Sequence, residues 1–241
     1  MNVEDAPAAA DLRRLAAALA EPTPLNWVIT GDSITHGVVH TQGGRSYQEH
    51  LHEVIRGELE RVRDVVLNTA VSGTRITEIL DDWDRRVASW RPDVVTLMIG
   101  TNDAADDKPS QFVSPAEYAA SLRDFVTRVR ALGAIPVLQT PPAIDIRNAP
   151  ERARIGDFVD AVRQVAADED TILVDQYAHF AELGAGGLAW GLLNDPIHPG
   201  AVGHAAITLH LARALGLNPA PERARTLPLL AGMVATARIH P

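Results

Sequence analysis

The stretch "VITGDSITHG" (Val28 to Gly37) carries a short apolar run into a polar turn. The run ends at Gly31, and Asp32 and Ser33 follow it directly. A short apolar run bounded by turn residues predicts a buried strand, so Ser33 would lie where that strand gives way to a helix. Gly, Asp and Ser also build ordinary turns and N-caps, so this stretch alone leaves Ser33 two roles, helix cap or nucleophile.

Four other apolar runs along the chain are similar to this first one. The five runs are "LNWVIT" (25–30), "DVVLNTA" (64–70), "DVVTLMIG" (93–100), "AIPVLQT" (134–140) and "TILVDQ" (171–176). They are rich in apolar and β-branched residues and do not alternate cleanly between apolar and polar positions. This pattern is typical of strands that are buried on both faces.

Segments with helical spacing separate the runs. The clearest one begins at Ser114, a predicted N-cap, with Pro115 at the first helical position and Glu117 completing a capping box. Helices are expected over 47–61, 114–132, 150–168 and 200–215. Strands and helices that alternate in this way predict an α/β fold with a parallel sheet and right-handed crossovers.

Two regions fit this alternation less well. Residues 178–194 are rich in glycine and apolar residues but lack firm periodicity, so a loop or lid is expected there. The tail beyond Gly216 contains an apolar segment, Leu227 to Val234, that must pack against something. It could cover the body of the domain or, in a homo-oligomer, a neighbouring subunit.

The length of 241 residues suits one large domain. A hydrophobic fraction of 46% with 22% charged residues is ordinary for a globular protein and supplies ample material for a core. We expect a single domain over residues 1–241, with its core in 25–216. A helix over 9–20 and a C-terminal extension over 217–241 would be appendages of this core.

Composition narrows the classes of function. Cysteine is absent, which removes cysteine nucleophiles, thiolate metal sites and disulfides together. The net charge of −9 disfavours nucleic acid and anionic membranes as partners. The N-terminus is acidic where a signal peptide would be basic, and no stretch approaches the roughly 20 apolar residues of a membrane span. These features predict a cytoplasmic protein with a small-molecule partner, no nucleic-acid partner and no membrane span.

The residues just after the apolar runs carry the chemistry. Ser33 follows the first run, Gly73 follows the second, and Asn102 follows the third within "GTND". The segment "NDPIHPG", before the last expected helix, supplies Asp195 and His198. Ligands of parallel α/β sheets bind outside the carboxyl ends of the strands, so we expect these residues at one edge of the sheet.

Each of these residues has a role in acyl transfer. The Ser33 hydroxyl would be the nucleophile, and it needs an adjacent base. His198 is the candidate base, and Asp195, three residues earlier, could orient its ring. The candidate oxyanion donors are the backbone N–H groups of Ser33 and Gly73 and the side-chain amide of Asn102.

Taken alone, each block also has a purely structural interpretation. Ser33 could be a helix cap, Gly73 a turn glycine, Asn102 a turn residue and His198 a surface residue, and we expect Asp103 to be a turn residue or a cap. The four blocks together, in this order and at these strand ends, favour an active site over the structural alternatives.

Other motifs carry less information. His36 and His40 are four residues apart but make only a weak candidate for a metal pair. Neither a dinucleotide fingerprint nor a Gly-Lys-Ser/Thr phosphate loop occurs in the sequence. We therefore expect neither a metal nor an organic cofactor.

The blocks "GDSIT", "GTND" and "DPIHP", with Gly73 between the first two, resemble those of the SGNH hydrolases, the superfamily of GDSL esterases and lipases. The resemblance runs from about Asn26 to about Leu215. One departure is Ile34, which stands where the GDSL block has leucine. The α/β-hydrolase elbow Gly-x-Ser-x-Gly is not matched, which separates the two hydrolase folds.

The resemblance implies a three-layer α/β/α, flavodoxin-like domain with a central parallel sheet of about five strands. It also implies a Ser-His-Asp triad without a metal or cofactor. Carried over position by position, Ser33 is nucleophile and oxyanion donor, and His198 is the base that Asp195 orients. Gly73 and Asn102 complete the oxyanion hole.

The expected function is that of a serine esterase acting on a small or medium acyl ester, such as an O-acetylated sugar or metabolite, through an acyl-enzyme. A thioesterase or lysophospholipase would use the same chemistry on another substrate. A non-catalytic module that binds an acylated ligand is the alternative from outside the enzymes.

Overall fold

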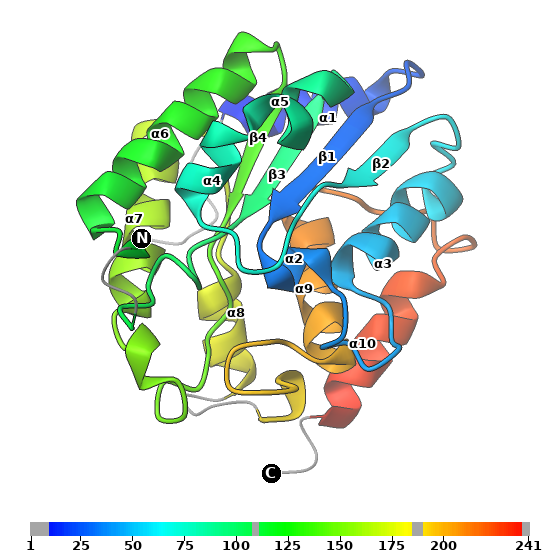
Figure 1. Ribbon diagram of the computed structural model, residues 1–241. Helices are drawn as coiled ribbons and strands as arrows, with labels where there is room; N and C mark the ends of the chain where they lie inside the picture. The colour runs from blue at the N-terminus through cyan, green and yellow to red at the C-terminus, as the bar shows by residue number, and fades with distance from the viewer. Residues whose placement is uncertain (1–9, 108–110, 185–189, 238–241) are drawn as a thin grey trace, which may run out of the picture.

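The computed structural model describes residues 10–107, 111–184 and 190–237, and it shows one parallel sheet between two layers of helices (Figure 1). The strands are β1 (Asn26–Gly31), β2 (Val65–Asn68), β3 (Val94–Met98), β4 (Ile135–Gln139) and β5 (Ile172–Val174). Each of the five apolar runs forms one strand, which confirms the predicted α/β fold with a five-stranded parallel sheet.

The strands lie in the order β2-β1-β3-β4-β5. Val28 in β1 lies opposite Leu67 in β2 on one side and opposite Val95 in β3 on the other. The sheet therefore grows outward in both directions from β1, which is the flavodoxin-like order. Its switch point lies beside the carboxyl end of β1, where ligands bind in sheets of this kind.

The helices cover both faces of the sheet (Figure 1). One face carries α1 (Ala10–Ala20), α3 (Tyr47–Glu53), α8 (Gln176–Leu183), α9 (Ala201–Ala214) and α10 (Thr226–Ala237). The other face carries α4 (Ile76–Asp81), α5 (Trp83–Arg86), α6 (Pro115–Ala131) and α7 (Ile155–Asp168). The short helix α2 (Ser33–His36) follows β1 directly.

Side chains of β1 alternate between the two cores that result. Trp27 and Ile29 pack among the residues of α1, α3, α8, α9 and α10, whereas Val28 packs with those of α4, α6 and α7. Trp27 is fully buried, and its indole N–H donates to the Asp64 carboxylate at 3.0 Å. Burial on both faces explains why the strand sequence does not alternate between apolar and polar residues.

The expected helices form, with adjusted ends. The Ser114 hydroxyl accepts from the Glu117 N–H at 3.2 Å, and the Glu117 carboxylate accepts from the Ser114 N–H at 2.9 Å, which confirms the capping box. The helix expected over 47–61 is shorter, because α3 ends at Glu53 and a π-helical turn, Val54–Glu58, continues it. The segment 150–168 opens with a 3₁₀ turn before α7 begins.

The prediction of a loop or lid over 178–194 is wrong for its first part, which lies in α8. Asp175 caps this helix by accepting the Ala178 N–H at 3.0 Å, and the side chains of Phe180 and Leu183 are buried. Tertiary packing thus stabilises a helix whose own apolar pattern is too short to predict it. Residues 185–189, in the middle of the expected loop, lie outside the described residues, and a 3₁₀ turn follows at Trp190–Leu192.

The C-terminal tail forms α10, which packs against α9 (Figure 1). Leu230 and Val234 are buried and belong to the core on that face of the sheet. At the start of α10, the Thr226 N–H donates to the Glu58 carboxylate at 2.5 Å. The apolar tail segment therefore covers the body of the domain.

Across the described residues, every helix is too short or too polar to cross a membrane.

Candidate active site

Ser33 is held at the junction of β1 and α2. Gly31 ends β1 with φ of 154°, and a Cβ there would lie 2.2 Å from the Met98 carbonyl oxygen of β3, so only glycine fits at this turn. Asp32 then caps α2 by accepting the Ile34 N–H at 2.9 Å. Ser33, 9% exposed, is the first residue of the helix, so the cap and the candidate nucleophile are neighbouring residues.

Asp195 and His198 lie in one loop before α9. The Asn194 N–H donates to the His198 carbonyl at 2.8 Å, which closes the loop at its base. Within it, one Asp195 carboxylate oxygen accepts the backbone N–H groups of Ile197 at 2.9 Å and His198 at 2.8 Å. The spacing of three residues therefore brings the carboxylate back onto its own loop, beside the imidazole.

The structure brings Ser33, His198 and Asp195 into one hydrogen-bonded row. Ser33 Oγ lies 2.9 Å from His198 Nε2. His198 Nδ1 lies 2.9 Å from Asp195 Oδ2 and 3.0 Å from Oδ1. An Nδ1–H that donates to the carboxylate leaves Nε2 as a proton acceptor facing the hydroxyl, which is the geometry of an activated serine.

Electrostatics favour a charged Asp195 and a neutral His198. Partial burial raises the pKa of Asp195, but hydrogen bonds from Ile197 and His198 outweigh it, so the pKa lies below its usual value. For His198, burial disfavours the imidazolium more than Asp195 stabilises it, and the nearby His40 and Arg152 add to this effect. The pKa of His198 is therefore lowered, and a neutral ring can act as a base.

Gly73 and Asn102 lie in turns that contact each other. Gly73, with φ of 82°, follows β2, and no atom lies within 4 Å of the position where a Cβ would stand. The Asn102 amide, in the turn after β3, donates one hydrogen to the Thr74 carbonyl at 3.1 Å. This bond joins the two turns and leaves the second amide hydrogen of Asn102 as a further donor.

A groove of about 480 Å³ extends from Gly73. It is lined by Gly73, Arg75, Thr77, Glu78, Gln111, Phe112, Val113 and Glu117. Most of these side chains are polar or charged, and the Phe112 ring is 48% exposed. The groove therefore offers hydrogen-bonding groups and one aromatic face next to the candidate oxyanion site.

Two other carboxyl groups near the site are buried in its base. Burial raises the pKa of Asp32 to about 7, and it raises the pKa of Asp103 to about 7 as well. Asp103 accepts the Ile76 N–H at the start of α4 at 2.9 Å, so it anchors that helix, as its expected role as a cap requires. Both residues thus support the turns that carry Ser33 and Asn102.

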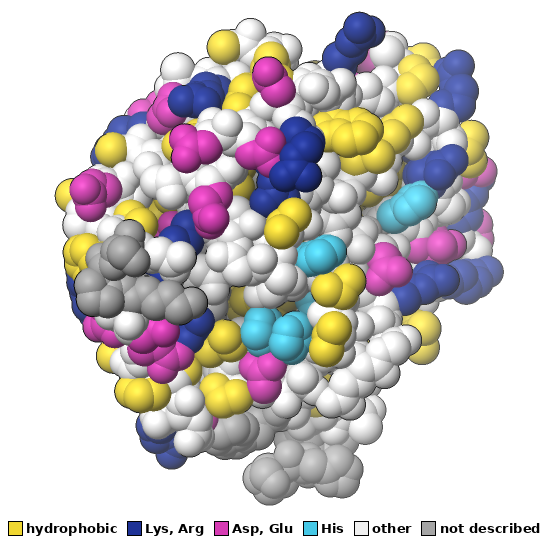
Figure 2. Space-filling model, in the orientation of Figure 1, with side chains coloured by type: hydrophobic (Ala, Val, Ile, Leu, Met, Phe, Trp, Pro, Cys, Tyr) yellow, Lys and Arg dark blue, Asp and Glu magenta, His cyan; other side chains and the backbone are white. Residues whose placement is uncertain are grey.

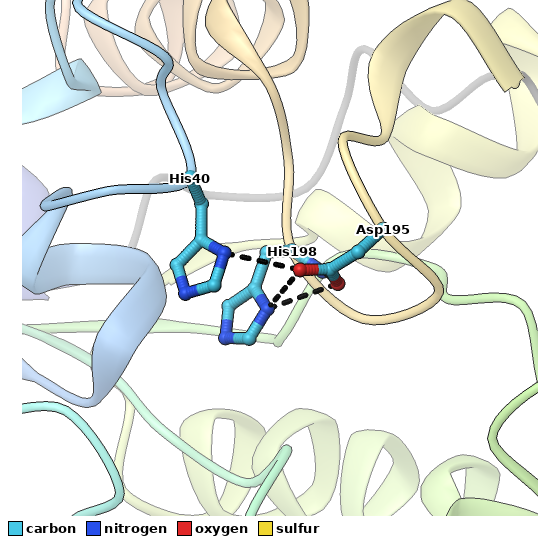
Figure 3. Close-up of side chains that lie close together, drawn as sticks. All are labelled: His40, Asp195 and His198. Atoms are coloured by element: carbon cyan, nitrogen blue, oxygen red, sulfur yellow. Dashed lines mark hydrogen bonds and ion pairs between the residues drawn. The ribbon is translucent and has the colours of Figure 1, made fainter.

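His40 is the site residue that sequence reasoning missed. Its Nδ1 lies 3.0 Å from Asp195 Oδ2, and its ring stacks on that of His198, with centroids 3.5 Å apart and planes 9° from parallel (Figure 3). His36, its supposed metal partner, instead bonds the Ser72 hydroxyl at 3.1 Å. The weak interpretation of His36 and His40 as a metal pair is not supported by these contacts.

Among the described residues, His40, Asp195 and His198 form the one group of His, Asp and Glu side chains close enough together to hold a metal ion. Imidazole lone pairs lie in the plane of the ring, and two nearly parallel rings stacked 3.5 Å apart do not direct both lone pairs at one ion. The cluster therefore fits a hydrogen-bonded network better than a metal cage. Figure 2 shows histidine side chains gathered on the surface in the region of α2.

The doubly wound sheet and the hydrogen-bonded Ser–His–Asp row are those of an α/β serine hydrolase. The model of the GDSL-like Lipase/Acylhydrolase family matches residues 29–206, and the chain belongs to this family. It is an SGNH-type serine esterase.

Two relatives illustrate the similarity. The acetylxylan esterase of Geobacillus stearothermophilus is 28% identical over 206 residues, which cover 78% of this chain and 92% of that protein. Its crystal structure aligns with a TM-score of 0.70 and 25% identity, over 80% of this chain and 94% of that one. An alpha/beta hydrolase enzyme from the metagenome of Lake Arreo, Spain, aligns with a TM-score of 0.70 and 29% identity, over 82% and 99%.

Crystal structures also exist of catalytic mutants of that acetylxylan esterase. In these mutants a serine, an aspartate or a histidine is replaced by alanine, and the aspartate and the histidine are three positions apart in its chain.

Proposed function

We propose that this esterase hydrolyses a small or medium acyl ester through an acyl-enzyme, with Ser33 as nucleophile, His198 as general base and Asp195 as the residue that orients it. The observation that carries the proposal is the 2.9 Å contact between Ser33 Oγ and His198 Nε2, with Asp195 on the other ring nitrogen. The same three residue types are replaced in the catalytic mutants of the acetylxylan esterase, where the aspartate and histidine have the same spacing.

The proposed reaction follows from this row. His198 Nε2 takes the Ser33 hydroxyl proton as Oγ attacks the ester carbonyl carbon, and the carbonyl oxygen becomes an oxyanion. His198 then returns the proton to the leaving alcohol as the C–O bond breaks. Water attacks the acyl-enzyme in the second half, again losing its proton to His198, and the acid is released while Ser33 regains its proton.

The proposed oxyanion hole has three donors. The N–H of Ser33, as the first residue of α2, lies outside the helical hydrogen-bond ladder. The N–H of Gly73 borders open space, and Asn102 has a second amide hydrogen available. Donors fixed in this way stabilise the charge that develops in the transition state without having to reorganise.

The groove beside Gly73 favours a polar leaving group. Its charged and polar lining can bond hydroxyl groups, and the exposed Phe112 ring offers a face on which a sugar can rest. A long acyl chain would instead need a largely apolar channel. Together with the similarity to an acetylxylan esterase, this lining supports an O-acetylated sugar over the thioester and lysophospholipid alternatives.

The direct test is the variant Ser33→Ala. Because the hydroxyl is the proposed nucleophile, we expect hydrolysis of p-nitrophenyl acetate to fall by about 10⁴-fold or more, and labelling by a fluorophosphonate probe to disappear. Ser72→Ala, which removes an exposed serine from the neighbouring turn, is the matched control and should keep most of the activity and all of the labelling.

Two results would contradict the proposal. Undiminished turnover by a folded Ser33→Ala variant would remove the assigned nucleophile. A wild-type protein that neither turns over esters nor reacts with the probe would support the non-catalytic binding module. A series of p-nitrophenyl esters from acetate to palmitate, run beside acetylated sugars, tests the substrate, and a maximum of kcat/KM at long chains would favour the lysophospholipase alternative.

A further inference from the structure

His40 enters the site from the loop between α2 and α3, which none of the four sequence blocks contains. Its side chain is 27% exposed, compared with 13% for His198 and 32% for Asp195. Figure 3 shows its ring lying against His198, with the Nδ1 side directed toward the Asp195 carboxylate. His40 therefore touches two members of the proposed triad without taking part in the proton transfer described above.

The Asp195 carboxylate is shared between two imidazoles. Its Oδ1 accepts two backbone N–H groups of its own loop, whereas Oδ2 lies 2.9 Å from His198 Nδ1 and 3.0 Å from His40 Nδ1. An ionised carboxylate only accepts, so His40 must present its Nδ1–H to this oxygen. His40 thus holds the carboxylate in place and draws on the same negative charge that stabilises a protonated His198.

The loop that carries His40 is tied to the loop that carries Asp195. The Gln42 side-chain amide donates to the Asn194 side chain, which precedes Asp195 directly. Val39 and Gln42 have positive φ angles of 69° and 51°, so the backbone on both sides of His40 is bent into the left-handed region. A strained loop held by a cross-loop bond is the kind of support that fixes one side chain against another.

We propose that His40 is a positioning residue that fixes the Asp195 carboxylate and the His198 ring and makes His198 a weaker base than Asp195 alone would. For its effect on turnover the inference rests on the proposed function. For its effect on the ring of His198 it rests only on the contacts of His40.

The sign of the effect follows from the charges around His198. Its stabilising partner is Asp195, while His40 and Arg152 oppose a positive charge on the ring. His204 on α9 also lies near both rings but stays neutral, because burial lowers its pKa to about 3. Removing the donor and the stacked ring at position 40 leaves Asp195 to His198 alone, so the pKa of His198 should rise.

Three variants separate the parts of this role. His40→Phe keeps an aromatic ring against His198 but removes the donor and any charge. His40→Asn keeps an N–H donor near Asp195 but removes the ring. His40→Ala removes both, and His52→Phe, on α3 and bonded to Arg56, is the matched control for replacing a histidine elsewhere.

The first measurement is an NMR titration of the His198 ring in the Ser33→Ala background, which needs no activity. Because one pKa unit corresponds to a tenfold change in proton affinity, we expect the pKa of His198 to rise by about 0.5 to 1 unit in His40→Phe and His40→Ala and by less in His40→Asn. The control should leave it unchanged. An unchanged or lowered pKa in both His40→Phe and His40→Ala would overturn the proposal.

The second measurement is the pH profile of kcat/KM with Ser33 intact. The acid limb should move to higher pH by the same amount, and His40→Ala should lower kcat by about 10-fold with little change in KM, since the base is less well held. Active variants whose acid limb stays in place would overturn the inference. If the NMR shift is found but no form shows Ser33-dependent turnover, the proposed function fails while the positioning of His198 by His40 stands.

Discussion

Two carboxyl groups flank the proposed nucleophile, and they differ in every physical respect. Asp32 precedes Ser33 in the sequence, is 1% exposed, and has its pKa raised to about 7 by burial. Asp195 lies far along the chain, is 32% exposed on its side chain, and has its pKa lowered by its hydrogen bonds. The carboxylate that serves the base is thus chosen by its environment and not by its distance in sequence.

The number of donors explains the difference. Asp32 accepts the Ile34 N–H at the start of α2, and the charge of the nearby Asp103 further disfavours its ionised form. Asp195 accepts two backbone N–H groups and has two imidazole nitrogens within 3.0 Å. Donors to the charged form stabilise it, so Asp195 stays ionised where Asp32 favours a proton.

The largest test of this comparison is a matched pair of substitutions. Asp195→Asn keeps the shape but loses the charge and the acceptor that holds the Nδ1–H tautomer of His198, so kcat should fall by about 10²- to 10⁴-fold. Asp32→Asn keeps a good N-cap for α2, so kcat should stay within about 10-fold of the wild type. Steady-state kinetics on p-nitrophenyl acetate checks both, and comparable losses in the two variants would contradict the assignment of roles.

The neighbouring pair Asn102 and Asp103 repeats the contrast on a smaller scale. Asn102 offers its amide to the proposed oxyanion, so Asn102→Ala should lower kcat by about 10²- to 10³-fold with little change in KM. Asp103→Asn keeps an acceptor for the Ile76 N–H and should leave kcat nearly unchanged. A fall in KM alone, or an equal loss of kcat in both variants, would argue against Asn102 as an oxyanion donor.

Local signals predicted most of the fold. The five apolar runs and the capping box at Ser114 depend on residues close in sequence, and the structure confirms them. Helix α8 was missed because its stability comes from burying Phe180 and Leu183 against other elements. The single-domain boundaries, the cytoplasmic location and the oligomeric state stay predictions from the sequence.

The site was predictable to the extent that strand ends define it. Ser33 and Asn102 follow neighbouring strands, so topology alone brings them to one edge, and the spacing of Asp195 and His198 suggested their contact. His40 carries no such signal. It reaches the carboxylate only because its loop bends through positive φ angles at residues that are not glycine, and local sequence preferences argue against that conformation.

The smallest expected effect concerns stability, and it tests the protonation of Asp32 directly. Its pKa rises from 3.8 in the unfolded chain to about 7 in the folded protein, so the folded state binds more protons between these values. The stability that Asp32 contributes is therefore full below about pH 4 and is lost as pH rises through about 7. Asp32→Asn removes this dependence, because an amide does not titrate in the range.

Urea unfolding at pH 5 and pH 8 measures the difference. Relative to the wild type, Asp32→Asn should be more stable at pH 8 than at pH 5, by about 1 to 3 kcal/mol, since each pKa unit corresponds to about 1.4 kcal/mol. Asp195→Asn should show the opposite sign, because the lowered pKa of Asp195 stabilises the fold above about pH 4. A pH-independent difference between Asp32→Asn and the wild type would mean that Asp32 titrates alike in both states, and the contrast between the two carboxyl groups would then rest on hydrogen bonding alone.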